Sequence, residues 1–439
     1  MILNENFSVG LYTLGCKVNQ YESEAIAEEL QKHGMCICPP SSSCDAYIIN
    51  TCTVTAESDR KARQFIRRAI KKNPKAYILV TGCMAQTAAN DIAQIDGVDV
   101  IVGNSGKLLC VNELLALIDK KQKNESPKII VDDILKAKFE DMSITRFDRT
   151  RAYVKIEDGC ENKCTYCIIP SARGKVRSKD PQRILDEVGL LVRNGCREIV
   201  LTGIETASYG KDLDGIDLGD ILCKIDKIPG ICRVRLGSLD PSLIKPDFAK
   251  KLASIKSLAP HFHLSLQSGS DKILALMKRK YNSAMAMKAI SLLRENIENV
   301  KFTTDVIVGF PGETEEDYFA TESFVKEAGF LTVHIFPYSK RKGTPAASMS
   351  DQLSNEVKSD RLHRLEAVAH RTAKDILDVE CRTQSIKTVL FETYADGYAY
   401  GHTDDFLEVA VKTDIPLRSE FRDVRLTSNN GSICFGELV

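Results

Sequence analysis

The sequence predicts an α/β protein in three parts: an amino-terminal parallel α/β domain, an open, partial (β/α)6 barrel and a small all-β barrel at the carboxyl end. Two runs of alternating apolar and amphipathic segments indicate the first two parts, and a final stretch of short, turn-rich strands indicates the third. The chain has 439 residues, which is too long for one hydrophobic core and corresponds to about three domains.

Residues 1–125 form the predicted amino-terminal domain. The apolar runs VGLYTLG, DAYIIN, AYILVTG and VDVIVG alternate with amphipathic stretches such as YESEAIAEELQKHG and ESDRKARQFIRRAIKK. Apolar runs followed by segments of helical period are typical of βα units in a parallel sheet. The polar stretch DKKQKNESPK ends this domain, and we expect residues 126–150 to be a linker.

Residues 151–372 form the predicted partial barrel. Six strand-like runs occur in it: RAYVKIEDG, REIVLTG, CRVRLGSLDP, HFHLSLQSGS, VKFTTDVIVGFPGE and LTVHIFPYS. A closed barrel of this type needs about eight βα units, so we expect an open one whose working residues lie on loops at the carboxyl ends of the strands. A charged helix, LSNEVKSDRLHRLEAVAHRTAKDIL, leads out of it. Residues 373–439 contain short strands broken by DG and NNG turns, which fits a small β-barrel.

The composition limits the classes of partner. Lysine and arginine together number 60, as do aspartate and glutamate, so RNA binding has to come from local patches. The first residues lack the features of a signal peptide, and no apolar window approaches the about 18 residues of a membrane span. We therefore expect a cytoplasmic protein without a membrane partner. With 15 cysteines, such a chain favours metal or redox chemistry over disulfides.

The motif GCENKCTYC places Cys160, Cys164 and Cys167 directly after a predicted strand. Three thiolates leave one iron of a 4Fe-4S cluster open, and this iron can chelate S-adenosylmethionine and pass an electron into its sulfonium bond. We expect these cysteines to be the catalytic centre. The alternative, a structural zinc site, needs a fourth ligand, and no histidine or cysteine lies near enough in the sequence.

A second set of cysteines follows from the βα period. Cys16 follows LYTLG, Cys52 follows YIINT and Cys83 ends YILVTGC. Because the carboxyl ends of parallel strands share one sheet edge, these three thiols converge in the number that suits a second open cluster. Taken singly, each is also consistent with a buried strand-end cysteine. The remaining cysteines are expected to be small buried hydrophobic residues.

The whole chain resembles the methylthiotransferases of the radical S-adenosylmethionine superfamily. The resemblance rests on TLGCKVNQYESEAIAEEL, INTCTVT, TGCMAQ, GCENKCTYCIIPSARGKVRSK, RLGSLDPSLI, HLSLQSGSDKILALMKRKY and TDVIVGFPGETEED. It implies a radical SAM barrel with a terminal TRAM domain, and an activity that attaches a methylthio group to an unactivated carbon. It also implies two 4Fe-4S clusters, with Cys160, Cys164 and Cys167 holding the radical-generating one and Cys16, Cys52 and Cys83 holding an auxiliary one that delivers sulfur.

The signatures GCKVNQYESE and HIFPYSKRKGTPA look most like the MtaB-type branch, which acts on threonylcarbamoyladenosine next to the anticodon of tRNA. This implies S-adenosylmethionine as both radical source and methyl donor, with hydrogen abstraction at carbon 2 of the adenine. The implied partners are the tRNA anticodon loop, a one-electron reductant such as a flavodoxin or ferredoxin, and a sulfur source. The alternatives are the isopentenyladenosine branch and the branch that modifies a ribosomal protein aspartate. One departure is Ala207, where the branch more often has glycine.

Six further residues are expected to contact the cofactor. Tyr166 precedes the last cysteine of the motif and could pack on the adenine, and Glu205 ends a strand beside the cluster. Polar side chains at predicted strand ends suit the ribose and carboxylate of S-adenosylmethionine: Ser238, Gln267 and Asp305. For Ser238 the alternative is a helix cap. Arg279 could bind a carboxylate, or it could lie at a solvated helix end.

Two features could contact RNA. The segment RKARQFIRRAIKK contains seven basic residues on one predicted amphipathic helix: Arg60, Lys61, Arg63, Arg67, Arg68, Lys71 and Lys72. Such a face can contact phosphates, although charge runs are often only solvated. Aromatic residues near the turns of the terminal barrel suit stacking on unpaired bases: Tyr394, Tyr398, Tyr400 and Phe406. Both features are also consistent with a remote alternative, a non-catalytic metal-containing RNA-binding protein.

Overall fold

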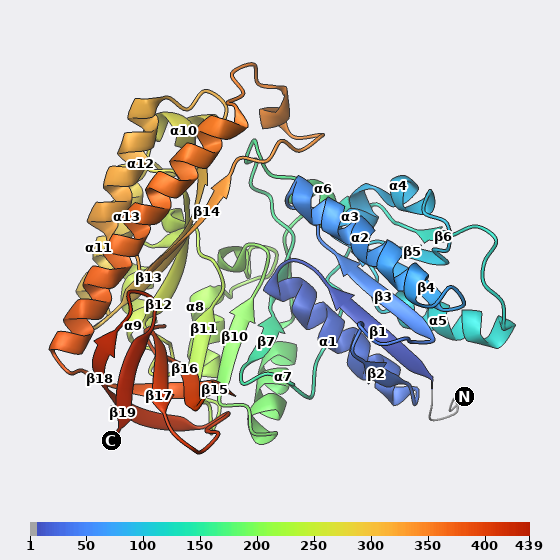
Figure 1. Ribbon diagram of the computed structural model, residues 1–439, viewed down its shortest axis with the longest axis horizontal. Helices are drawn as coiled ribbons and strands as arrows, with labels where there is room; N and C mark the ends of the chain where they lie inside the picture. Colours follow the sequence, from blue (N-terminus) through green and yellow to red (C-terminus); the bar gives the residue numbers. More distant parts are fainter. Residues whose placement is uncertain (1–6) are drawn as a thin grey trace.

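The computed structural model describes residues 7–439, and Figure 1 shows the amino-terminal sheet beside the barrel strands, with a small β-barrel packed below them. The three-part α/β prediction is confirmed. In the described part of the chain, no helix combines the length and the apolar character needed to cross a membrane.

The amino-terminal sheet has the order β2-β1-β3-β4-β5-β6, and all its strands are parallel. The strands are β1 (Ser8–Thr13), β2 (Cys36–Cys38), β3 (Ala46–Thr51), β4 (Tyr77–Gly82), β5 (Val100–Val102) and β6 (Lys128–Ile130). The helices are α1 (Lys17–Lys32), α2 (Ala56–Lys72), α3 (Cys83–Thr87), α4 (Ala89–Ala93) and α5 (Leu109–Lys120). One face of the sheet packs Ile49 and Ile78 against α2, and the other packs Ile48 against α1 and α5. The domain therefore has three layers: α2 on one side, the sheet in the middle, and α1 and α5 on the other side.

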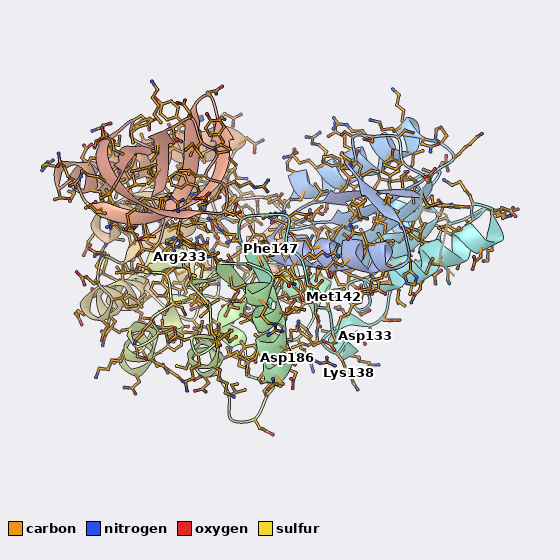
Figure 2. All side chains as sticks on the ribbon, turned by 90° about the horizontal axis from the view of Figure 1, so that it is seen from below. Asp133, Lys138, Met142, Phe147, Asp186 and Arg233 are labelled. Carbon is orange, nitrogen blue, oxygen red and sulfur yellow. The ribbon has the colours of Figure 1, made fainter. Side chains whose placement is uncertain are left out.

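The segment expected to be a linker is packed into the molecule. β6 pairs with β5, and a 3-10 turn, η1 (Ile134–Lys136), follows it. Figure 2 shows Met142 and Phe147 between the amino-terminal sheet and the barrel. Met142 and Ile144 are buried in the largest hydrophobic cluster, and the carbonyl of Met142 accepts a hydrogen bond from Tyr21 Oη at 2.7 Å. The segment is polar overall, but it contains apolar residues that are buried, and for this reason it packs into the fold instead of forming a linker.

The central part contains six parallel strands in two three-stranded sheets, β11-β10-β7 and β12-β13-β14. A parallel bridge between Leu239 and Leu264 links the two sheets, so the strands form an open barrel. The strands are β7 (Ala152–Lys155), β10 (Glu198–Thr202), β11 (Arg233–Leu236), β12 (His261–Gln267), β13 (Lys301–Val308) and β14 (Thr332–Pro337). A short antiparallel pair, β8 (Glu157–Asp158) and β9 (Arg177–Ser178), follows β7.

Helices cover the outer face of these strands. They are α7 (Pro181–Arg193), α8 (Leu218–Ile225), α9 (Pro246–Ala253), α10 (Asp271–Leu276), α11 (Ser283–Asn296), α12 (Glu315–Ala328) and α13 (Asn355–Arg382), with 3-10 turns η2 (Thr206–Ser208), η3 (Pro241–Leu243) and η4 (Pro345–Ser348). The short helix α6 (Ile169–Arg173) packs instead against α3 of the amino-terminal domain. Alternate strand residues such as Leu201, Phe302 and Val306 belong to the main hydrophobic cluster. The intervening residues, including Arg235, His263 and Asp305, are polar and form the inner face.

The carboxyl-terminal part is a closed barrel in the order β15-β16-β17-β19-β18. Its strands are β15 (Ile386–Ala395), β16 (Tyr398–Thr403), β17 (Glu408–Lys412), β18 (Phe421–Asn429) and β19 (Cys434–Leu438). α13 runs past the boundary expected at residue 372, so the barrel begins only at β15. Guanidinium groups attach it to the central strands: Arg233 donates to the carbonyl of Thr388 at 3.1 Å and Arg235 to that of Thr403 at 2.6 Å.

Candidate active site

The structure brings Cys16, Cys52 and Cys83 to one edge of the amino-terminal sheet. They follow β1, β3 and β4, which are neighbours in the sheet, and we call them the sheet triad. Burial and the nearby Cys83 thiol raise the pKa of Cys52 to about 11, and Cys16 acts on it in the same direction. The convergence expected from the βα period is therefore present, and loss of the Cys16 and Cys52 protons, whose pKa values are both raised, is favoured by a positively charged partner such as iron.

Cys160, Cys164 and Cys167 lie in one loop after β8, and we call them the loop triad. The loop is fixed by backbone bonds: the amide of Cys160 donates to the carbonyl of Gly174 at 3.0 Å, and that of Cys167 to the carbonyl of Cys164 at 3.1 Å. Burial raises the pKa of Cys160 to about 12 and that of Cys167 to about 11. Cys160 and Cys167 stay partly accessible.

Neither cysteine triad has the compact arrangement of a single-ion site. Among residues 7–439, one group of three potential metal ligands has all its donor atoms within 4.8 Å of one another, and it contains no cysteine. In each triad at least one pair of sulfurs is therefore farther apart than this. Ligands of a single zinc ion at about 2.3 Å would lie closer together, whereas thiolates around a four-iron cluster stand wider. The donor sets thus suit clusters better than zinc.

Three glycines that directly precede triad cysteines were missed from the sequence. Gly15, Gly82 and Gly159 have φ of +99°, +98° and +89°, a conformation that favours glycine. A Cβ on Gly82 would lie 2.3 Å from the carbonyl oxygen of Thr51, and one on Gly159 would lie 1.9 Å from that of Lys175. These glycines let Cys83 and Cys160 leave their strands at a sharp angle. The Gly-Cys pairs in the sequence were the available signal.

Arg279 is buried beside the loop triad and does not lie at a solvated helix end. Its Nη1 lies 3.2 Å from the sulfur of Cys164, and its Nη2 pairs with Asp240 Oδ2 at 3.0 Å. Its Nε also donates to Tyr281 Oη at 3.1 Å. The guanidinium is therefore held in place by Asp240 and Tyr281, and it offers positive charge directly at the Cys164 sulfur.

The other expected cofactor residues surround the same loop, with one exception. Tyr166 packs against the apolar group around Met277, and Glu205 accepts a hydrogen bond from Asn162 Nδ2 at 3.1 Å. Burial and the charge of Asp240 raise the pKa of Glu205 to about 7. Ser238 is exposed just after β11. Gln267 ends β12 with φ of +67°, a strained conformation that costs about 1 kcal/mol.

Asp305 is the exception. The sequence placed it at a strand end, but it lies in the middle of β13, with residues up to Val308 still paired to β14. Its Oδ2 pairs with His263 Nε2 at 3.1 Å. The strand continues through the apolar residues that follow Asp305, which explains the difference.

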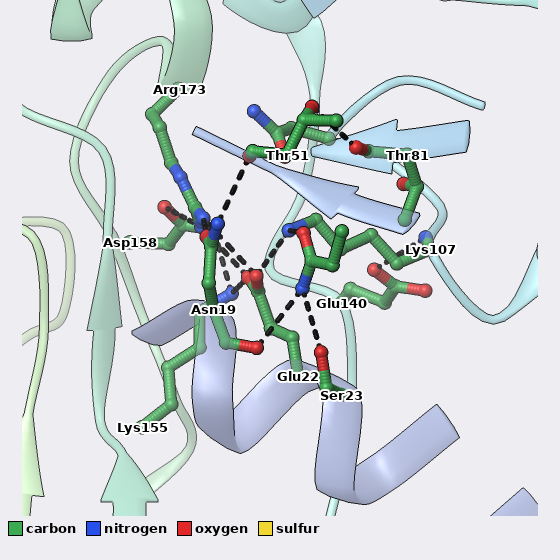
Figure 3. Close-up of polar contacts among 12 residues, drawn as sticks. Asn19, Glu22, Ser23, Thr51, Thr81, Lys107, Glu140, Lys155, Asp158 and Arg173 are labelled. Atoms are coloured by element: carbon green, nitrogen blue, oxygen red, sulfur yellow. Dashed lines mark hydrogen bonds and ion pairs between the residues drawn. The ribbon is translucent and has the colours of Figure 1, made fainter. Parts of the chain in front are cut away.

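A buried charge network between the amino-terminal domain and the barrel could not be identified from the sequence (Figure 3). Arg173, at the end of α6, pairs with Glu22 Oε1 of α1 at 2.7 Å and with Asp158 Oδ1 at 3.1 Å. Lys107 and Lys155 also pair with Glu22. Burial alone would raise the pKa of Glu22, but Arg173 and the two lysines hold it well below its usual range. The network joins the helix that follows Cys16 to the strand that precedes Cys160.

Most of the residues expected to contact RNA lie on the surface, but one of the barrel aromatic residues lies in an interface within the protein. On α2, Arg60 pairs with Glu57 and Arg63 lies 3.9 Å from Asp91. The other basic residues are exposed: Lys61, Arg67, Arg68, Lys71 and Lys72. In the terminal barrel, Tyr394 is exposed, whereas Phe406 stacks between His261 and His402. Phe406 therefore belongs to the interface with the central strands, and Tyr394 remains available for stacking on a base.

Two family descriptions match the chain: the Radical SAM superfamily over residues 154–325, and Uncharacterized protein family UPF0004 over residues 8–103. The chain is 40% identical over 412 residues to a threonylcarbamoyladenosine tRNA methylthiotransferase MtaB of Bacillus subtilis, covering 92% of this chain and 90% of the relative. A protein of the same name from Thermotoga maritima is 39% identical and covers 84% of this chain and 82% of the relative.

A tRNA-2-methylthio-N(6)-dimethylallyladenosine synthase of Hydrogenobaculum is also 39% identical, over 80% of this chain and 81% of the relative. Among solved structures, the radical S-adenosylmethionine methyltransferase TsrM from Kitasatospora setae, with cobalamin and a [4Fe-4S] cluster bound, has a TM-score of 0.56. It is 15% identical and covers 79% of this chain and 77% of that one, a likeness that concerns the fold.

Proposed function

The chain belongs to the tRNA methylthiotransferases of the radical S-adenosylmethionine superfamily, and on that premise we propose that it adds a methylthio group to carbon 2 of threonylcarbamoyladenosine next to the anticodon. The observation that carries the proposal is the pair of cysteine triads on facing parts of the fold, bridged by one charge network. Two such sites suit a reaction that needs both a radical source and a sulfur carrier. Membership of this enzyme family removes the non-catalytic alternative.

In this proposal the loop triad holds the cluster that binds S-adenosylmethionine. When bound, that cluster supplies the electron for reductive cleavage of the sulfonium bond. The protein binds and orients the cofactor: Tyr166, Glu205 and Arg279 surround the loop, and Ser238 and Gln267 end the neighbouring strands. Asp305 lies within β13 rather than at its carboxyl end, so we propose that it contacts the substrate instead of the cofactor.

The sheet triad holds the second 4Fe-4S cluster in this proposal, and that cluster carries the sulfur. The position of Cys16, Cys52 and Cys83 on three adjacent strands supports this assignment. Arg173 lies near enough to act on the Cys83 and Cys16 thiols while pairing with Asp158, two residues before Cys160. This arrangement fixes the position of the cluster that carries sulfur relative to the cluster that generates the radical.

The tRNA partner requires an accessible, positively charged surface and a base that leaves its stack. We propose that exposed lysines and arginines of α2 contact phosphates and that the terminal barrel contacts the anticodon loop. A loop base is already unpaired, so moving it into the site costs little. A flavodoxin or ferredoxin supplies the electron and an additional donor supplies the sulfur.

Mass spectrometry of tRNA nucleosides tests the substrate. Cells that lack this protein should contain threonylcarbamoyladenosine without its 2-methylthio form, and the full chain should restore that form whereas Cys160→Ala should not. Cys232→Ser is the matched control because Cys232 is exposed and belongs to neither triad. An unchanged nucleoside profile would contradict the proposal and point to the ribosomal protein aspartate.

A second candidate is methylthiolation of isopentenyladenosine, because a relative named for the dimethylallyladenosine reaction is as similar in sequence as the Thermotoga protein. Loss of the 2-methylthio form of that nucleoside in the same experiment would favour it. The residues that separate the two substrates must then lie where the N6 substituent is bound.

A further inference from the structure

The inner face of β12, β13 and β14 carries a polar group that the cluster chemistry does not use. Register places His263 beside Thr303 and Asp305 beside His334, so these side chains lie on one face of the sheet. The donor atoms of His263, Asp305 and His334 lie within 4.8 Å of one another. We call these three residues the polar wall.

Both ring nitrogens of His263 already have partners, whereas Asp305 and His334 each keep polar atoms without one among the residues that the structure describes. Its Nε2 pairs with Asp305 Oδ2 at 3.1 Å and its Nδ1 is bonded to Thr303 Oγ1 at 2.9 Å. The ring of His334 stacks on that of His263 with centroids 5.9 Å apart, and its side chain is exposed. The ring nitrogens of His334 and the second oxygen of Asp305 are therefore available to a ligand.

Lys17, in the amino-terminal domain, lies near enough to this wall for the charge of Asp305 to act on its amine. It is the first residue of α1 and follows Cys16 directly. Protein atoms surround it closely although it remains accessible to solvent, and the charged groups that act on it include Asp305, Arg151 and Arg235. Within residues 7–439 its amine has no hydrogen bond and no ion pair shorter than 4.0 Å. A cation in this position is ready for an anionic ligand.

The surroundings add positive charge rather than neutralise it. Three guanidinium groups, those of Arg151, Arg233 and Arg235, share the carboxylates of Glu198 and Glu392. Lys17 adds a further cation opposite the single carboxylate of Asp305. This excess disfavours a metal ion on the polar wall and favours a ligand with its own carboxylate.

We propose that Lys17 and the polar wall form a subsite for the threonyl carboxylate and hydroxyl of threonylcarbamoyladenosine. The Lys17 amine pairs with the carboxylate, and His334 and Asp305 bond the hydroxyl and the carbamoyl N–H. This proposal rests on the proposed function. A dimethylallyl group offers no partner for these polar side chains, so the site rejects it. The subsite explains why a polar wall lies on the inner face of these strands.

The experiment compares two anticodon stem-loop RNAs, one with threonylcarbamoyladenosine and one with its neutral carboxamide, on reconstituted enzyme. The wild type should show about 10- to 100-fold lower kcat/KM and weaker binding for the carboxamide. With the natural RNA, Lys17→Gln should lower kcat/KM by the same factor as the carboxamide does in the wild type. With the carboxamide RNA, Lys17→Gln should cause no further loss, because the ion pair between lysine and carboxylate is already absent. Lys17→Arg should restore most of the preference for the carboxylate.

The controls separate this proposal from the proposed function. Lys32→Gln removes an exposed lysine at the other end of α1 and should leave both RNAs unaffected. Iron content must stay at the wild-type value in Lys17→Gln, because Cys16 is adjacent. If the wild type modifies the natural RNA and Lys17→Gln keeps the full preference over the carboxamide, the subsite is wrong and the function stands. If the wild type ignores the natural RNA, the function itself is wrong.

A metal outcome is also decisive. One manganese or zinc ion per chain, retained by the wild type and lost in His334→Ala without loss of iron, would make the polar wall a metal site and overturn the proposal. No such ion is expected, because the Lys17 amine would repel it.

Discussion

The two cysteine triads reach similar arrangements by different routes. The loop triad comes from one short segment, which is held by a backbone bond to the nearby Gly174 and by another to Met277, much farther along the chain. The sheet triad comes from three βα units and exists only when β1, β3 and β4 lie side by side in register. A local motif can therefore be recognised from the sequence alone, whereas the second site is a property of the topology. The comparison also predicts that the two sites respond differently to substitution.

The largest expected effect separates the two sites by chemistry. Cys160→Ala and Cys52→Ala should each lose about four irons per chain. Cys160→Ala should form no 5′-deoxyadenosine, whereas Cys52→Ala should still cleave S-adenosylmethionine but transfer no methylthio group. Iron analysis and chromatography of the products measure both. If Cys52→Ala also failed to cleave S-adenosylmethionine while keeping the loop-triad iron, the division of roles would be wrong.

The charge network should couple the two sites. Arg173→Met removes one of the two cations that pair with both Glu22 and Asp158, Lys155 being the other, and breaking such buried pairs costs about 3–5 kcal/mol. Denaturant unfolding measures the loss, and both clusters should be lost together, unlike in the cysteine variants. Arg67→Met is the control, since Arg67 is exposed on α2, and it should change stability by less than about 0.5 kcal/mol. Independent loss of one cluster would refute the coupling.

A backbone substitution should affect the sheet triad alone. In Gly82→Ala the new Cβ meets the carbonyl oxygen of Thr51 at 2.3 Å, so Cys83 must shift and the auxiliary iron should be lost. Gly195→Ala is a matched control: its φ is +92°, but no atom lies within 4 Å of the added Cβ. It should show only the strain of its backbone, about 1 kcal/mol, and full iron content. Equal iron in both variants would contradict the steric argument.

The smallest effect concerns Glu24 of α1, whose pKa burial raises to about 7. The folded protein then holds a proton that the unfolded chain releases near its ordinary pKa of 4.5, so stability falls as pH rises from about 4.5 to 7 and is constant above. Glu24→Gln should remove this fall and stabilise the protein at pH 8 by about 1 kcal/mol. Thermal unfolding between pH 5 and pH 8 measures it; an unchanged slope would show that Glu24 is ionised throughout.

Much of the fold was predictable because its signals are periodic. Alternating residues such as Phe302 and Val306 marked the buried face of a strand, and the cysteines after β1, β3 and β4 followed from the βα repeat. The prediction that Asp305 lies at a strand end was wrong, because β13 continues beyond this polar residue to Val308. Arg173 and Glu22 were not identified, since nothing in their local sequence shows that they meet across two domains.

The residues around the loop triad show the same limit. Arg279 could be placed at a helix end from its neighbours, but its contacts to Cys164 and Asp240 depend on a strand and a loop far away in the chain. Lys17 carried no signal beyond its place next to Cys16, and only the register of β12, β13 and β14 puts the polar wall on the inner face that it approaches. Local sequence identifies chemical groups, and long-range packing decides what they face.

The packed segment around Met142 has a consequence for the order of assembly during synthesis. Tyr21 and Glu22 emerge from the ribosome early, yet their partners Met142, Lys155 and Arg173 are made much later. Until then the nascent amino-terminal domain exposes a tyrosine hydroxyl and a carboxylate at its future interface. All three cysteines of the sheet triad are made before the residues that complete this interface, so the sheet edge that carries them can form while the boundary between the two parts is still open.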